Sequence, residues 1–507
     1  MEWPWISSVI MLPLATALLC GVVPARRAVV VGTIGAVLTV CSVAGLLWRL
    51  WHHGTIVEAL GGWDAPLGIE LYVDGFSGLM LAMTATVGIF VSLFSIGYFG
   101  SSPDGEERGS DHHEGFFWAL WLVVWAALNG VFASADLFNM YVCIELMGLG
   151  SVALVALAGP MALRAAMRYL LVTLAGSLFY LLGVALLYGG WGTLDMQLLS
   201  GLMEASAASE VALAVMTLGL ALKTALVPLH FWLPAAHANA PAPVSAVLSA
   251  LVVKASFYML ARLWIDVFDV VDTDAMAVVL ATLGAVAIFW GSIQALRQAR
   301  LKLLVAYSTV AQIGYLFVAF APATVDAATE AAWHGVVYFA IAHGCAKGAM
   351  FLAAGAIATA LGGDRFSEMR GTGIELALPM FAFALAGLGL MGLPPSGGYT
   401  AKWYLLTAAA RAEMPVVAAV VTIGGLLAAL YVFKALYFAF ARGSGDDGDD
   451  PTGGEPSLRP IPITMIIAAL GLASVSVALG LWSAIPLETI DIGLPFDTAV
   501  EEGTAVD

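Results

Sequence analysis

Long apolar segments recur along almost the whole chain and limit its fold more than any other feature. A transmembrane helix takes about 20 mostly apolar residues. Inside a bilayer every backbone polar group needs a partner, and a helix supplies those partners within one segment. The sequence therefore predicts an all-α, polytopic membrane protein with about 14 transmembrane helices. We place them at residues 4–23, 28–50, 74–100, 115–133, 136–159, 164–190, 211–232, 241–264, 274–296, 302–321, 331–361, 374–408, 414–441 and 460–484.

Composition excludes several other classes of protein. Apolar residues make up 61% of the 507 residues and charged residues only 11%, whereas soluble proteins carry roughly 25% charged residues. The 20 Lys and Arg residues are scattered, so we expect no nucleic-acid partner. No nucleotide-binding loop and no metal-ligand spacing occurs, so we expect neither cofactor nor metal. The cysteines are interpreted as small buried side chains: Cys20, Cys41, Cys143 and Cys345.

Charge alternates between successive loops. Lys and Arg gather in the loops after the first, fifth, ninth and eleventh spans, namely Arg26, Arg27, Arg164, Arg168, Arg297, Arg300, Lys302, Arg365 and Arg370. The intervening loops carry mainly Asp and Glu. Because loops rich in Lys and Arg stay in the cytoplasm, we expect both termini outside, in a multi-pass protein of the cell (plasma or inner) membrane. The N-terminal segment lacks a basic start and is interpreted as a first span.

The acidic excess belongs mainly to the polar stretches. The net charge is 20 − 36 = −16, and the sizeable polar stretches are 101–114, 443–459 and the tail 486–507. We divide the chain into N-terminal helices with a polar loop (1–114), a first proton-channel repeat (115–264), a second, inverted repeat (265–442), and a polar loop, last helix and acidic tail (443–507).

Five ionisable side chains interrupt the apolar spans. An ionised group at the bilayer centre costs at least about 2.5–3.5 kcal/mol, so such residues are functional candidates. They are Glu145, Lys223, Lys254, Lys347 and Lys402. Glu145 could be a carboxyl group kept protonated by burial, or it could pair with Lys223. We favour the pair, because a proton that joins or leaves the lysine would change the strength of the pair.

Other polar residues in the spans are interpreted more variously. His343 precedes Lys347 by four residues, which places both on one helical face, and histidine titrates near neutral pH. Lys302 is interpreted as structural, and Lys434 could reach the inner interface or serve the interior. His230 and His237 are seven residues apart, but Pro234 and the lack of a third ligand argue against a metal.

Prolines interrupt two spans in corresponding positions. Pro228 and Pro234 fall in and after the seventh span, and Pro394 and Pro395 fall in the twelfth. Because proline cannot continue the helical hydrogen-bond ladder, we expect helices 7 and 12 to be broken. Each is the fourth span of a group of five, spans 4–8 and spans 9–13. Paired interruptions in two halves are typical of inverted repeats.

Four motifs resemble one family of membrane subunits. They are LKTALVPLHFWLPAAHANAPAPVSAVLSALVVKASFYMLARL, AYSTVAQIGY, HGCAKGAMFLAAG and GLPPSGGYTAKW. They occur in the order in which the antiporter-like subunits carry them. Over roughly residues 60–440 the chain resembles these subunits, which belong to respiratory complex I, membrane-bound hydrogenases and Mrp-type cation/proton antiporters. The segments GGWDAPLGIELYVDGFSGLMLAMTATV and NGVFASADLFNMYVCIELMGLGSVALVALAG look most like the D-type subunit of the Mrp Na⁺/H⁺ antiporter.

The resemblance implies roles for the interior charges. Glu145 and Lys223 would be the coupling pair, Lys254 the central relay, His343 and Lys347 its continuation, and Lys402 the residue that exchanges protons with the outside. It implies other membrane subunits as partners, with H⁺ and possibly Na⁺ as the ions moved, and no flavin, iron–sulfur or nicotinamide site in this chain.

Four functions remain to be distinguished. The first is a proton-translocating subunit of an Mrp-type antiporter. The alternative is an antiporter-like (NuoN/NuoM/NuoL-type) proton-pumping subunit of complex I or of a membrane-bound hydrogenase; a lysine at position 402 speaks against the NuoM type. A stand-alone solute transporter would need a substrate cavity that no cluster of arginines or aromatic residues suggests. A purely structural subunit would leave five costly interior charges without a purpose.

Overall fold

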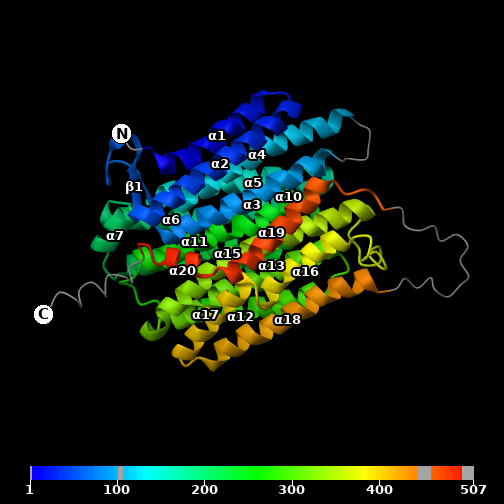
Figure 1. The fold of residues 1–507 in the computed structure, drawn as a ribbon. Coiled ribbons are helices and arrows are strands. Elements are labelled where there is room, and N and C mark those ends of the chain that lie inside the picture. Colours follow the sequence, from blue (N-terminus) through cyan, green and yellow to red (C-terminus); the bar gives the residue numbers. More distant parts are fainter. Residues whose placement is uncertain (1–2, 101–106, 442–457, 494–507) are drawn as a thin grey trace, which may run out of the picture.

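Apolar helices run the length of the molecule and lie side by side, with successive spans in opposite directions (Figure 1). The computed structural model describes residues 3–100, 107–441 and 458–493. In these ranges thirteen helical segments are long and apolar enough to span a bilayer. The broken pair α16 (Ala377–Met391) and α17 (Gly397–Arg411) occupies the predicted twelfth span. The fold is thus the predicted polytopic all-α membrane protein.

The first half begins with four helices and continues around a break. Its spans are α1 (Trp5–Val22), α2 (Ala25–His53), α3 (Gly75–Gly100), α4 (Glu107–Ala133), α5 (Leu137–Ala156), α6 (Pro160–Trp191), α8 (Ala207–Thr224) with η2 (Leu229–Trp232) and α9 (Leu233–Asn239), and α10 (Ala242–Val247) with η3 (Leu248–Val252), α11 (Val253–Arg262) and η4 (Leu263–Val267). The segments η3 and η4 are π-helical turns that continue α10 and α11 without a gap.

The second half repeats this order of unbroken and broken helices. Its spans are α12 (Asp274–Arg297), α13 (Leu301–Val318) with α14 (Phe320–Ala323), α15 (Asp326–Leu361), the α16–α17 pair, α18 (Pro415–Phe440) and α19 (Ile463–Leu481). Both predicted breaks are present, at residues 225–232 and 392–396. The inverted relation between the two halves, and the division into four regions, stay predictions.

Short elements close one end of the bundle. Strands β1 (Ile56–Ala59) and β2 (Glu70–Val73) pair antiparallel, with η1 (Leu60–Gly62) after β1. The purely helical expectation missed this hairpin. Glu58 on β1 accepts hydrogen bonds from the backbone N–H groups of Ile6 and Ser7, at 2.7 and 3.0 Å. The hairpin thereby caps the N-terminus of α1, whose first N–H groups have no partners within the helix.

Other predictions about polar segments need correction. The sequence predicts a polar loop over 101–114, but α4 begins at Glu107. The helix therefore includes polar residues that precede its apolar, membrane-spanning part. The tail forms a short helix, α20 (Ala484–Ile490). Residues 442–457 and 494–507, which carry much of the predicted acidic loop and tail, lie outside the described residues. Cys41 is exposed on the outer surface of α2 rather than buried.

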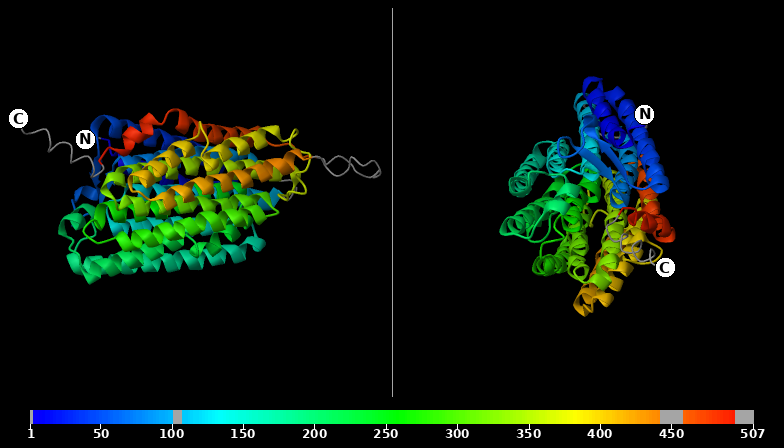
Figure 2. Two further views of the ribbon diagram at one scale, coloured as in Figure 1. Left: turned by 90° about the horizontal axis from the view of Figure 1, so that it is seen from below. Right: turned by 90° about the vertical axis from the view of Figure 1, so that its left-hand side faces the viewer.

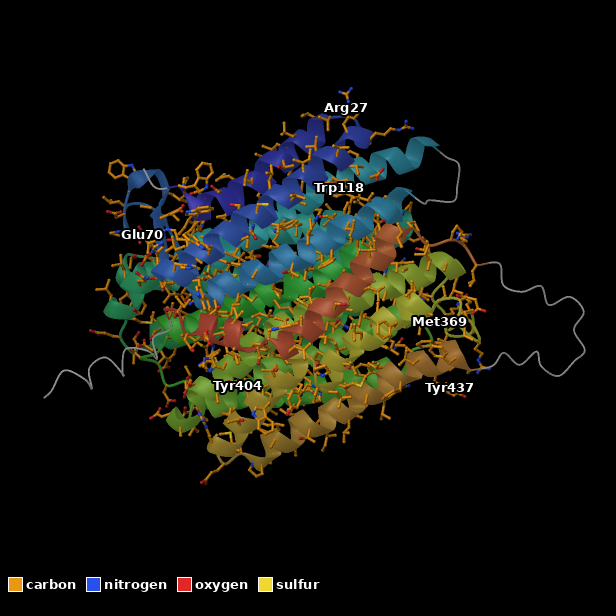
Figure 3. The ribbon with its side chains drawn as sticks, viewed as in Figure 1. Arg27, Glu70, Trp118, Met369, Tyr404 and Tyr437 are labelled. Carbon is orange, nitrogen blue, oxygen red and sulfur yellow. The ribbon has the colours of Figure 1, made fainter. Side chains whose placement is uncertain are left out.

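The two ends of the bundle differ in charge. Glu70 lies at the end that holds the hairpin, α7 (Met196–Leu202) and α20, whereas Arg27, Met369 and Tyr437 lie toward the other end (Figure 3). The helix starts and ends place the predicted basic loops together at this second end. Viewed along the helices, the cross-section of the bundle is elongated (Figure 2). Helices α1 and α2 lie at one end of it, and α18 lies at the other. Between them, α15 and the α10–α11 span are buried on all sides.

Candidate functional site

Glu145 and Lys223 face each other near the middle of their spans. The Lys223 Nζ atom lies 3.6 Å from the Glu145 carboxylate. Two hydroxyl groups of α6 complete the pair: Ser177 donates to Glu145, and Thr173 accepts from Lys223 at 2.9 Å. Lys223 is the last residue but one of α8, directly before the break. The predicted proximity of the two charges is therefore present, with Thr173 and Ser177 as partners that the sequence did not reveal.

Lys254 is fully buried and bonds to the π-helical turn that precedes it. Its ammonium group donates to the carbonyl oxygen of Ser249 in η3. A π-helical turn disturbs the regular hydrogen-bond ladder and is frequent at functional sites. The Ser249 hydroxyl also contacts the hydroxyl of Thr309 on α13, at 2.8 Å. Ser249 therefore connects the Lys254 ammonium group to the next helix.

The same region of α13 binds Lys347. The Lys347 ammonium group donates to Ser308 Oγ at 2.7 Å and to the carbonyl oxygen of Val305 at 2.6 Å. Thr309 donates to this same carbonyl oxygen, at 3.1 Å. Polar contacts thus lead from Lys254 to Lys347 across α13. The Ser249 carbonyl oxygen accepts from Lys254, the Ser249 hydroxyl group contacts Thr309, and the Val305 carbonyl oxygen accepts from both Thr309 and Lys347.

Two buried histidines lie beside this series. His343 is one turn before Lys347 on α15, and its ring stacks on Phe339 at 5.3 Å. His237 on α9 is fully buried and stacks on Phe351, whose ring also lies 5.2 Å from the Lys347 ammonium group. Both nitrogens of each ring lack a hydrogen-bond partner within the described protein. On sequence alone, His237 is interpreted as serving hydration of the helix break or proton access near the inner side, and it lies close to the central lysines.

Lys402 lies at the second helix break. Its ammonium group donates to the carbonyl oxygens of Leu390 and Met391, at 2.7 and 3.4 Å, which end α16. It also lies 4.3 Å from the centre of the Tyr315 ring. Gln312 on α13 donates to the same Leu390 oxygen at 3.3 Å and to the Tyr431 hydroxyl at 3.0 Å. One carbonyl oxygen therefore connects Lys402 to α13, the helix that also contacts Lys347 and Ser249.

The remaining polar candidates are held at the ends of helices. Lys434 donates to the carbonyl oxygens of Leu296 and Gln298, at 2.7 and 2.6 Å, and so caps the C-terminus of α12. Lys302 donates to the carbonyl oxygen of Ala240. His230 lies in the first break, 3.3 Å from the indole nitrogen of Trp290. No cluster of three metal-ligating side chains occurs within the described ranges.

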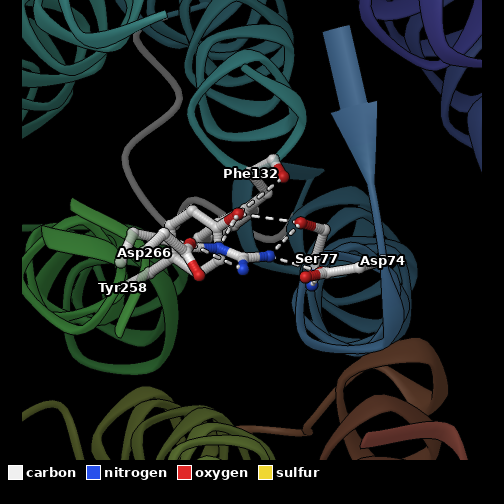
Figure 4. Close-up of polar contacts among 6 residues, drawn as sticks. Asp74, Ser77, Phe132, Tyr258 and Asp266 are labelled. Atoms are coloured by element: carbon white, nitrogen blue, oxygen red, sulfur yellow. Dashed lines mark hydrogen bonds and ion pairs between the residues drawn. The ribbon is translucent and has the colours of Figure 1, made fainter. Parts of the chain in front are cut away.

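The structure contains a second buried charge cluster that was not predicted from the sequence. Arg262, at the end of α11, donates to Asp74 and Ser77 of the α3 start and to Asp266 in η4, the last at 3.0 Å (Figure 4). Arg262 and Asp74 are 2% and 1% exposed, so the charges are paired away from water. Tyr258 extends the cluster to the backbone of Phe132 on α4. An arginine inside an apolar span was the available signal.

The site forms a row across the bundle rather than a pocket. The ionisable groups lie on α5, α8, α11, α15 and α17, and α8 packs against α11 as α15 packs against α17. The helix α13 carries none of these groups but packs against α15. Polar contacts join Glu145 to Lys223, and Lys254 to Lys347. Direct contacts between Lys223 and Lys254, and between Lys347 and Lys402, do not occur among the described residues, so the row has two gaps.

Comparison with known proteins places this architecture in a family. Residues 134–428 match the family described as NADH:quinone oxidoreductase/Mrp antiporter, TM, and residues 62–106 match the N-terminal family of complex I chain 5. The chain is 34% identical to NADH-quinone oxidoreductase subunit N of Desulforudis audaxviator, over 91% of each chain. It is 28% identical to the D-type subunit of the Na⁺/H⁺ antiporter of Alkalihalophilus pseudofirmus, over 77% of each.

A solved structure agrees with both the sequence matches and the fold. A chain of the Mrp complex from Dietzia sp. DQ12-45-1b superposes with a TM-score of 0.84 and 25% sequence identity, covering 96% of each chain. The match to the family extends from α5 through the second helix break, and so includes every residue of the row. This chain therefore belongs to the NADH:quinone oxidoreductase/Mrp antiporter family of transmembrane subunits.

Proposed function

We propose that this chain is the proton-translocating subunit of a multisubunit Mrp-type monovalent cation/proton antiporter. Protons would move along Glu145, Lys223, Lys254, His343, Lys347 and Lys402. The observation that carries the proposal is the series of contacts joining two fully buried lysines through Ser249 of η3 and through Thr309 and the Val305 carbonyl group of α13. Interior ionisable groups of membrane proteins mark ion pathways and proton relays, and the named antiporter relatives supply the class of complex.

The position of Glu145 supports an assembly with other membrane subunits. Its side chain is 16% exposed, although it lies in the middle of α5. Exposed apolar side chains surround it on the outer face of the same helix: Phe138, Val142, Leu146 and Leu149. A carboxylate at this depth would meet lipid unless another protein covers it. Exposure of a charged group to lipid is costly in free energy. We therefore propose that a partner subunit packs on this face of α5.

Transport by membrane vesicles that contain the intact complex tests the proposal. A Na⁺ gradient should drive proton movement, detected with a pH-sensitive dye. In Lys223→Ala and Glu145→Ala the dye response should disappear, while immunoblots show normal amounts of the complex. Lys434→Ala is the matched control, because it removes a lysine outside the proposed route, one that caps α12 and lies over the Phe366 ring. Normal transport by both relay variants would refute the proposed route.

One specific observation favours a second function. The 34% identity to a subunit N of an NADH-quinone oxidoreductase spans 91% of the chain, so redox-driven proton pumping is the alternative. Vesicles without an electron donor separate the two functions. Proton movement that follows a Na⁺ gradient alone supports antiport. Proton movement that needs an electron donor and ignores Na⁺ supports a redox-driven complex.

A further inference from the structure

A large cavity opens among helix ends, apart from the row of buried charges. Its volume is about 910 Å³, within the range of sites that bind small molecules. It lies between the ends of α3, α5 and α15 and the starts of α10, α13 and α19. The ends of α5 and α15 and the start of α13 adjoin predicted basic loops, whereas the end of α3 and the start of α19 adjoin polar acidic stretches. Because all of these are helix ends, the cavity lies near the surface of the bilayer.

Positive charge predominates on the cavity lining. The charged residues there are Arg300, Lys302, Arg459 and Asp364, which sum to three positive charges and one negative. Asp364 pairs with Arg300, whose Nε atom donates to it at 2.7 Å. Lys302 donates to a backbone carbonyl oxygen, and Arg459 is exposed beside Gly362. Lys302 and Arg459 thus have no carboxylate partner among the described residues.

The start of α13 adds partial positive charge at the same place. The helix begins at Leu301, and its N-cap residue, Arg300, accepts no side-chain capping bond. The first N–H groups of a helix lack partners within the helix, and this end attracts anions. The cavity therefore combines two cationic side chains that form no ion pair within the described part of the chain with a helix N-terminus, whose first N–H group, on Leu301, already donates to the Asp364 carbonyl oxygen at 2.7 Å. Its other walls include apolar side chains such as Phe99 and Leu157.

We propose that this cavity binds the phosphate group of an anionic phospholipid. Arg459 would bind the phosphate oxygens through its planar set of donors, and Lys302 would contribute a point charge. The apolar walls and the position near the bilayer surface suit a lipid whose chains extend into the membrane. Basic pockets between transmembrane helices are a general means of binding anionic lipid headgroups. Inorganic phosphate offers the same oxyanion without the chains.

Native mass spectrometry of the intact purified complex, stripped of lipid in detergent, tests this binding. The complex is titrated with phosphatidylglycerol, with phosphatidylcholine of the same chains, and with inorganic phosphate. We expect the wild-type complex to bind one phosphatidylglycerol molecule. Its affinity for this lipid should fall tenfold or more in Arg459→Gln and by an intermediate factor in Arg459→Lys. Arg297→Gln, at the same end but outside the cavity, is the matched control and should bind as the wild type does.

Each outcome decides the proposal. Phosphatidylglycerol binding that weakens in Arg459→Gln but not in Arg297→Gln supports a lipid site. Phosphate binding with that same dependence, without a preference for phosphatidylglycerol over phosphatidylcholine, supports an oxyanion site and overturns the lipid as its source. Equal binding by both variants overturns the cavity as an anion site. Phosphatidylglycerol binding at the phosphatidylcholine level, without phosphate binding that depends on Arg459, overturns it as well. Lys302→Gln provides a second variant if Arg459→Gln fails to assemble.

Discussion

At Lys402 a substitution can separate the ability to release a proton from the positive charge itself. Its ammonium group is held by two carbonyl oxygens at the C-terminus of α16, an end that favours a positive charge. A relay needs this group to release its proton as well as to hold it. Arginine keeps the charge but hardly deprotonates. We therefore expect Lys402→Arg to lower Na⁺-driven proton transport at least tenfold, and Lys402→Ala to block it.

The measurement uses vesicles with equal amounts of assembled complex. Transport is followed as dye response against time, and assembly is checked by the yield of the intact complex. Wild-type transport by Lys402→Arg would show that position 402 needs only a positive charge, and the assigned role of proton exchange would then be wrong.

Thr309 permits a test of the contacts across α13. Valine has nearly the shape of threonine but lacks the hydroxyl group, so Thr309→Val removes the contact to Ser249 while filling the same space. We expect a several-fold lower initial rate of proton transport. Thr407→Val is the matched control, since Thr407 bonds only to its own helix on an exposed surface. Equal rates in the two variants would exclude the Ser249–Thr309 link from the route.

At this scale the sequence predicts charges better than it predicts their partners. A lysine in an apolar span is conspicuous because it is costly, so Lys223, Lys254, Lys347 and Lys402 could all be singled out. Hydroxyl groups are common in membrane helices, where they often satisfy the carbonyl four residues earlier, as Thr224 does with Leu220. Which hydroxyl groups meet a lysine depends on helix packing, so Thr173 could not be chosen beforehand.

The breaks and π-helical turns differ in how well a sequence reveals them. Pro228, Pro394 and Pro395 mark the interruptions of α8–α9 and α16–α17, because proline in a helix interior removes a hydrogen bond. The signal is not infallible, since Pro13 lies inside α1, which continues unbroken. The π-helical turn η3 contains no such residue. It is stabilised by contacts with other helices and by Lys254, so local sequence gives no warning of it. Similarly, the β1–β2 hairpin depends on its contact with α1.

Close packing of α6 and α8 predicts an effect of a single methyl group. A Cβ atom at Gly176 would lie 2.8 Å from the carbonyl oxygen of Gly219 and 2.9 Å from Lys223 Cγ. Small residues let membrane helices approach closely, and overpacking typically costs about 1–3 kcal/mol. We expect Gly176→Ala to lower the melting temperature of the purified complex and to reduce transport by displacing Lys223.

The same helix offers a matched control. A Cβ atom at Gly190 of α6 would have no heavy atom within 4 Å, so Gly190→Ala makes the same chemical change without a clash. It should leave both the melting temperature and transport unchanged. If Gly176→Ala behaves like Gly190→Ala, the two helices are able to separate slightly, and the position of Lys223 does not depend on their close approach.

For the whole molecule, the charge pattern predicts which helix ends lie together. Short loops alternate between basic and acidic, and the structure gathers the basic ones at one end of the bundle. The pattern is readable because loop charge depends on the side of the membrane rather than on neighbouring helices. The lateral order of the helices is not readable in this way, since most apolar faces are chemically alike. The cluster around Arg262 joins α3 to α11, which are far apart in the chain. Such a contact follows from the lateral order of the helices and cannot be predicted from loop charge.

Arg262 and Asp74 predict how the bundle responds to loss of a buried charge. Removing one partner of a buried ion pair leaves the other uncompensated and typically costs about 3–5 kcal/mol. We expect both Arg262→Met and Asp74→Asn to lower the melting temperature of the purified complex strongly. The double variant should lose less than the sum of the two, because Asp74 no longer remains as an unpaired charge, while Asp266 loses its arginine partner in Arg262→Met and in the double variant alike. Arg297→Gln, an exposed change, should have almost no effect. Additive losses in the double variant would show that the two residues stabilise the bundle independently, and that the contact between them does not tie α3 to α11.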